Sequence, residues 1–189
     1  GTFESYSIQS GIAGSLLGVD ATGDNDVLQD FTFTPNLSDI DGDGDRDLLM
    51  SADFGTSKVF MNNGDGTFTH ATDRDVITDE AGMGGAVGDY DNDGDMDWFV
   101  SSIYNEEADL TGNRLYRNDG NGVFEDVTVA AGVEDGFWGW GSCFADFDND
   151  GYLDLFHVNG WTGCSSIAAT IGDTRHAYCG SKRVAPSRD

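Results

Sequence analysis

The feature that most restricts the fold is a nine-residue acidic pattern, Asp-x-Asp-x-Asp-Gly-x-x-Asp, which occurs three times and is followed each time by an apolar run. The three copies span residues 39–47, 89–97 and 146–154, and they hold 14 of the 29 aspartates in the chain. A surface that is acidic only for solubility would scatter its charges instead. Since the flanking residues recur with the pattern, we expect the chain to fold as a row of similar modules.

Each module has the residue pattern of about four short strands. Small and apolar residues precede each acidic loop and an apolar run follows it, which indicates two buried strands joined by the loop. After the first two loops, a Gly/Asn-rich turn divides residues 58–68 and 114–124 into two further runs, the signature of a β-hairpin. We therefore predict an all-β fold of β-propeller-type blades, each with about four antiparallel strands.

The repeats also suggest where the chain divides. The opening Gly1-Thr2-Phe3 matches Gly66-Thr67-Phe68, which predicts the last strand of a preceding module. No hairpin signature follows the third loop, so the propeller is expected to be partial or to be completed by another chain. The predicted parts are a half module at 1–30, modules near 31–80 and 81–135, a half module at 136–160, and an irregular basic tail at 161–189.

The acidic loops predict cation binding. Two like charges roughly 6 Å apart cost about 3 kcal/mol at an effective dielectric constant near 20, and each loop holds several such pairs. The ligands are all oxygen, which favours a hard cation and excludes zinc and copper. Many carboxylates in a flexible loop suit Ca²⁺ better than Mg²⁺, although Mg²⁺ and Mn²⁺ stay open. Positions are counted from the first aspartate of each loop. Gly at position 6 would permit a sharp turn of the loop, and the residue at position 7 would offer its backbone carbonyl to the cation. Asp at position 9 would complete the coordination shell.

About three Ca²⁺ ions are expected, one in each loop. The candidate ligands are Asp39, Asp41, Asp43, Asp45, Asp47, Asp89, Asp91, Asp93, Asp95, Asp97, Asp146, Asp148, Asp150, Tyr152 and Asp154. An EF-hand is excluded because its bidentate Glu belongs at position 12, where this chain has Met50, Val100 and His157.

The loops, the hairpins and the tract Gly82-Met83-Gly84-Gly85-Ala86-Val87-Gly88-Asp89 resemble the FG-GAP/VCBS repeat of integrin-α-like β-propellers. The residue pattern of the modules is similar to that of bacterial VCBS-repeat proteins and of the cartilage acidic protein group. The resemblance covers roughly residues 31–160. It implies blades around an axis, Ca²⁺ in each acidic loop, and an extracellular binding or adhesion role. Family propellers commonly have seven blades, whereas this chain holds about three.

Composition excludes several classes of function. The formal net charge is −26, from 35 acidic and 9 basic residues, so neither a nucleic acid nor an anionic membrane is an expected partner. No apolar run is long enough to span a bilayer. The three histidines are isolated from any nucleophile, and carboxylates saturated with metal cannot readily donate protons. We therefore do not expect an enzyme.

The remaining expectations concern single residues. Cys164 and Cys179 flank a stretch of the irregular tail, and a disulfide between them would suit an oxidising compartment; pairing between chains stays open. Cys143, in an apolar strand, is expected to be a buried thiol. Asn36 begins a glycosylation sequon. Four aromatic residues are expected to pack between blades, with a sugar-binding surface as the alternative: Phe137, Trp138, Trp140 and Trp161. Tyr90 and Phe147, at position 2 of their loops, are expected to pack likewise.

The sequence thus predicts a calcium-binding, extracellular structural or adhesion repeat protein, secreted or at the cell surface. Its partner would be a protein or glycan ligand, or itself. The first alternative is a subunit that forms a ring or filament by strand addition between copies. The second alternative is a calcium-dependent carbohydrate-binding module.

Overall fold

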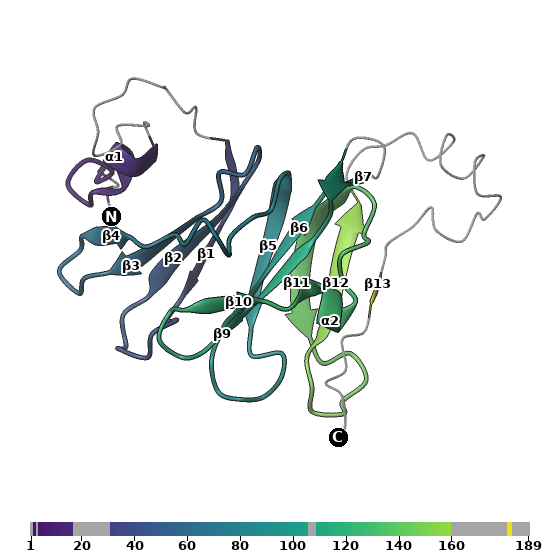
Figure 1. Cartoon of the computed structure of the whole chain (residues 1–189). Coiled ribbons are helices and arrows are strands. Elements are labelled where there is room, and N and C mark those ends of the chain that lie inside the picture. The colour runs from purple at the N-terminus through teal and green to yellow at the C-terminus, as the bar shows by residue number, and fades with distance from the viewer. Residues whose placement is uncertain (1, 3, 17–30, 106–108, 160–180, 183–189) are drawn as a thin grey trace.

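The computed structural model describes residues 2, 4–16, 31–105, 109–159 and 181–182, and it forms three antiparallel sheets side by side (Figure 1). The first sheet has the order β1-β2-β3-β4, with strands Thr32–Ser38, Asp47–Ala52, Lys58–Asn62 and Phe68–His70. The second has the order β5-β6-β9-β10, with strands Gly82–Gly88, Asp97–Ser102, Arg114–Asn118 and Phe124–Asp126. The third consists of β11 (Gly139–Ala145), β12 (Asp154–Asn159) and β13 (Ser181–Lys182).

The sheets are arranged as consecutive blades, because β5, the first strand of the second sheet, packs against both β1 and β11 (Figure 1). The predicted all-β architecture of about four antiparallel strands per module is confirmed. Each acidic loop joins the first two strands of its blade, as expected. The minor elements are the hairpin β7–β8 (Tyr104–Asn105 and Leu110–Thr111) and the helices α1 (Ile12–Leu16) and α2 (Thr128–Ala131).

The hydrophobic core lies between the blades, and strand β6 contributes side chains to it on both of its faces. All six residues of this strand are buried, and successive side chains point to opposite faces. Trp98 and Val100 join the cluster between the first two blades, whose buried members are Ile40, Leu49, Val59, Ile77, Trp98, Val100 and Tyr116. Phe99 joins the cluster between the second and third blades, with Ala86, Tyr90, Leu115, Val133 and Leu155.

Glycines let the inner strands approach closely. A Cβ placed on Gly84 of β5 would collide with the carbonyl oxygen of Trp140 in β11. A Cβ on the neighbouring Gly85 would collide with the side chain of Asn36 in β1. The glycine-rich tract 82–88 is therefore explained by packing of β5 between its two neighbours.

Two expectations about burial are corrected. The opening strand stays a prediction, because Gly1 and Phe3 lie outside the described residues. Cys143 is exposed rather than buried, and Phe147 is 59% exposed. In the second blade, Ala86 and Tyr90 occupy the matching positions and are covered by the third blade. Among the described residues no blade follows the third, so Cys143 and Phe147 face outward.

Candidate metal centre

Each of the three acidic loops brings three carboxylates together. In each loop, three aspartates place one carboxylate oxygen apiece within 4.8 Å of the others. The groups are Asp39, Asp41 and Asp43; Asp89, Asp91 and Asp97; and Asp146, Asp148 and Asp154. Nine of the 15 predicted ligands therefore gather in clusters, three in each loop.

The first aspartate of each loop also shapes the turn. Asp39 Oδ2 accepts a hydrogen bond of 2.9 Å from the backbone N–H of Gly44, and Asp89 and Asp146 accept the matching bonds from Gly94 and Gly151. These glycines have φ values of 96°, 102° and 90°, a left-handed conformation that L side chains rarely adopt. The glycine at position 6 is thus explained by the turn that curls the carboxylates toward one centre.

The aspartate at position 9 holds the loop closed. Asp47 Oδ2 accepts from the N–H of Ile40 (2.9 Å), and its Oδ1 accepts from the N–H of Asn62 (2.8 Å). Asp97 makes the same pair of bonds, with Tyr90 (3.0 Å) and Asn118 (2.9 Å). Position 9 was expected only as a metal ligand. It belongs to the carboxylate cluster in the second and third loops, but in the first loop Asp43 takes that place.

The position 7 side chains lie outside the carboxylate clusters. The carboxylates of Asp45 and Asp95 instead lie against Gly64 and Gly120 in the hairpin turn of the same blade. A Cβ on Gly64 would stand 2.7 Å from Asp45 Oδ2. The expected ligand at position 7 is the backbone carbonyl, and this stays a prediction for Asp45, Asp95 and Tyr152. The side chains of Asp93 and Asp150 also lie outside the clusters.

Electrostatics show that a cation would suit these loops. Burial, with added repulsion from Asp91 and Asp93, raises the pKa of Asp97 to about 7 even though it accepts two backbone hydrogen bonds. Burial and nearby aspartates likewise raise the pKa of Asp47 and of Asp91. At an effective dielectric constant near 20, two charges 4.8 Å apart repel by about 3 kcal/mol. The donor set consists of carboxylate oxygens, which is what a hard divalent cation such as Ca²⁺ prefers.

Two hairpin asparagines that contact the acidic loops were not among the predicted site residues. Asn62 and Asn118 occupy the same place in their blades, and each donates its backbone N–H to the position 9 aspartate. Their Nδ2 atoms donate to the carbonyl oxygens of Arg46 (3.0 Å) and Met96 (3.2 Å), at position 8 of each loop. The recurrence of Asn at this point of both hairpins was the available signal.

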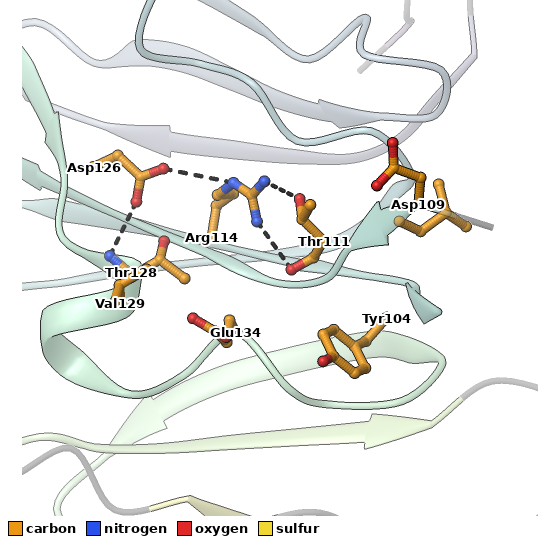
Figure 2. A pocket seen from close by; sticks show the side chains of 9 residues that line it. Tyr104, Asp109, Thr111, Arg114, Asp126, Thr128, Val129 and Glu134 are labelled. Carbon is orange, nitrogen blue, oxygen red and sulfur yellow. Dashed lines mark hydrogen bonds and ion pairs between the residues drawn. The ribbon is translucent and has the colours of Figure 1, made fainter. Parts of the chain in front are cut away.

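A pocket of about 550 Å³ lies apart from the acidic loops, beside β9 (Figure 2). The side chain of Arg114 is nine-tenths buried and pairs with Asp126 (3.5 Å) and Glu80 (3.6 Å). Its Nη1 also donates to backbone carbonyls, including that of Gly112 at 3.2 Å. Figure 2 shows Arg114 between Asp126 and Thr111. Because these partners occupy the guanidinium, we interpret Arg114 as a structural residue.

Two further predictions depend on where their residues lie. Cys164 and Cys179 lie outside the described residues, so their disulfide stays a prediction. Asn36 is half-buried, with its Nδ2 donating to the carbonyl of Gly85 at 3.4 Å. A glycan on that nitrogen would have to separate β1 from β5, which counts against glycosylation of the folded protein.

The comparisons with known proteins agree with this geometry. The sequence profile of the FG-GAP-like repeat matches residues 39–100 and 103–157, which is more than half of the chain. A 52-residue segment is 44% identical to cartilage acidic protein 1 of Mus musculus, covering 27% of this chain and 8% of that protein. This chain therefore matches only a small part of that relative. On the strength of the repeat profile and of the blades described above, the chain belongs to the FG-GAP-like repeat family.

Proposed function

We propose that this chain is a calcium-binding structural module in which one Ca²⁺ occupies each acidic loop. The observation that carries the proposal is the convergence of three carboxylates in all three loops. When bound, the cation would neutralise the repelling carboxylates. The aspartates would hold it, while the position 6 glycines and the position 9 aspartates keep the loop in the required turn.

We further propose that the role is extracellular and non-enzymatic, in adhesion or in scaffolding. Membership of the FG-GAP-like repeat family supports this proposal. Among the described residues, no helix is both long and apolar enough to cross a membrane. The protein or glycan partner is identified by neither observation and stays a prediction.

Calorimetry with matched variants tests the calcium role. Asp41→Asn keeps the turn acceptor but weakens one cluster, whereas Asp75→Asn makes the same charge change at an exposed site outside the loops. At Ca²⁺ concentrations about 20 times the dissociation constant, each site adds about 1.8 kcal/mol to the free energy of unfolding. We expect EDTA to lower the melting temperature of the wild type, and Asp41→Asn to bind more weakly than Asp75→Asn. An EDTA-insensitive melting curve would refute the proposal.

A second candidate function, association of blades head to tail, is favoured by the exposed faces of the outer blades. Leu37 in β1 is 58% exposed, and its counterparts Val87 and Phe144 pack between blades. On the third blade, Phe147 is exposed where its counterpart Tyr90 is buried. The first and third blades therefore present the surfaces that blades elsewhere use to pack together.

Native mass measurement with and without Ca²⁺ tests this candidate. Self-association predicts a mass above that of one chain, which falls when Leu37→Asp or Phe147→Asp is introduced. A monomer in both conditions would refute it. The carbohydrate-binding alternative has a separate test, because it requires glycan-array binding that EDTA abolishes.

A further inference from the structure

The hairpin of the second blade contacts the acidic loop of the first blade. The carbonyl oxygen of Ile40, at position 2 of the first loop, accepts two hydrogen bonds, from Asn118 Nδ2 (2.7 Å) and from the N–H of Gly122 (2.9 Å). The N–H of Ile40 donates to Asp47 Oδ2. The backbone at Ile40 is therefore held on one side by its own loop and on the other by the next blade.

Asn118 is also bound to the second acidic loop. Its backbone N–H donates to Asp97 Oδ1 at 2.9 Å, and its Nδ2 donates to the carbonyl oxygen of Met96 at 3.2 Å. Asp97 belongs to the carboxylate cluster of that loop. Because Asn118 is only 1% exposed, water does not readily replace these bonds. One buried residue thus connects the first loop to a carboxylate of the second.

Apolar packing reinforces this connection. The Ile40 side chain is 1% exposed and belongs to the core cluster that holds Trp98 and Tyr116 of the second blade. Trp98 directly follows Asp97, the last residue of the second loop. A first loop that relaxes to separate its carboxylates would therefore disturb both a hydrogen bond to Asn118 and the packing beside the second loop.

We infer that the first two loops bind Ca²⁺ cooperatively and that Asn118 transmits the coupling; this inference rests on the proposed calcium function. Ordering one loop fixes the Ile40 carbonyl and Asn118, so the other loop has less to order when its own cation binds. Repulsion between the two cations opposes this effect. It is screened over about 8 Å at physiological ionic strength, whereas the hydrogen bonds to Ile40 and Asp97 act by direct contact.

A site-resolved titration of the full chain measures this coupling. The amides of Gly44 and Gly94 donate to the first aspartate of their loops, so their NMR signals report each site separately. We expect Asp91→Ala, which disables the second site, to raise the half-saturating Ca²⁺ concentration at Gly44 by about 5-fold or more. Asp41→Ala should raise the value at Gly94 by the same factor, because coupling between binding sites is reciprocal.

The chain supplies a matched control for the coupling residue. Asn62 makes the same bonds within the first blade as Asn118 makes within the second, namely to the position 9 carboxylate and to the position 8 carbonyl. Of these two asparagines, Asn118 alone also donates to a loop of another described blade, at the carbonyl oxygen of Ile40. In Asn118→Ala, the effect of Asp91→Ala on Gly44 should become much smaller, although the Gly122 bond and the apolar packing remain. In Asn62→Ala the effect should persist at its wild-type size.

The possible results distinguish failure of the coupling inference from failure of the proposed calcium function. If neither glycine signal responds to Ca²⁺ in the wild type, the proposed function itself fails. If both respond but Asp91→Ala leaves the Gly44 midpoint unchanged or lower, the sites are not positively coupled and the inference is overturned. If Asn62→Ala abolishes coupling as fully as Asn118→Ala, the assignment to the bond between blades is wrong. Should Asn118→Ala not fold, the Asp41→Ala and Asp91→Ala arms still decide whether coupling exists.

Discussion

Asp79 is a fully buried carboxyl group outside the acidic loops, and it should make the folded protein less stable as the pH rises. It is 0% exposed, accepts hydrogen bonds from Ser57 Oγ (2.6 Å) and the Tyr116 hydroxyl (3.2 Å), and lies between the first two blades. Burial raises its pKa from 3.8 to about 6 despite these bonds. We expect Asp79→Asn to flatten the pH dependence of unfolding.

The sign and size follow from linkage. Since the pKa is higher in the folded state, the folded protein holds more protons than the unfolded chain between about pH 4 and pH 6, and stability falls as pH rises through this range. A shift of roughly 2 pKa units corresponds to about 3 kcal/mol in total. Of this, about 1.4 kcal/mol is lost between about pH 5 and pH 7.5.

Urea unfolding at saturating Ca²⁺ measures the effect. Asparagine keeps an acceptor for Tyr116 and can donate to Ser57, so the variant should fold. The free energy of unfolding of the wild type, relative to Asp79→Asn, should fall by about 1.4 kcal/mol between about pH 5 and pH 7.5. Asp75→Asn, an exposed neighbour, should keep the wild-type slope and so accounts for titration in the acidic loops. Parallel pH profiles for all three proteins would refute the reasoning.

Two further predictions compare matched residues by urea unfolding. Tyr90→Ala should lower the free energy of unfolding by about 3 kcal/mol, because Tyr90 is 8% exposed and packs between blades. Phe147→Ala should lower it by less than about 1 kcal/mol, because Phe147 is 59% exposed. Equal losses would contradict the assignment of these residues to covered and uncovered faces of the blades. Arg114→Ala should lower the free energy of unfolding by about 2 kcal/mol, since it removes a buried side chain together with its hydrogen bonds to backbone carbonyls and its pairs with the partly exposed Asp126 and Glu80. Arg117→Ala breaks an exposed pair with Glu125 and should stay within about 1 kcal/mol, so a larger loss for Arg117 would count against the structure.

The local part of the fold was predictable because its signals are short-range. The spacing of Asp39, Asp41 and Asp43, with glycine at position 6, predicts a turn that gathers carboxylates, and the structure shows that turn. The runs after each loop predict strands, and β2, β6 and β12 begin at the position 9 aspartate. These features depend on backbone conformation and residue periodicity within about a dozen positions.

Contacts between residues that lie far apart in the sequence were not predictable in the same way. Nothing local distinguishes Asn62 from Asn118, yet only Asn118 has an acidic loop of another described blade beside it. Cys143 and Ala86 stand at matching points of similar strands, and their burial differs because a blade covers one of them and not the other. Asp79 lies in a connection between modules, where no repeat pattern marks it.

The sequence by itself determined the repeat, the turn in each acidic loop and the carboxylate oxygens that these loops offer, because each is a property of a few adjacent residues. Only the tertiary structure decided which carboxylates converge, which asparagine joins two loops, and which apolar residues are covered. Those outcomes depend on residues far apart in the chain, such as Asn118 and Ile40, which are 78 positions apart and meet only when the blades pack.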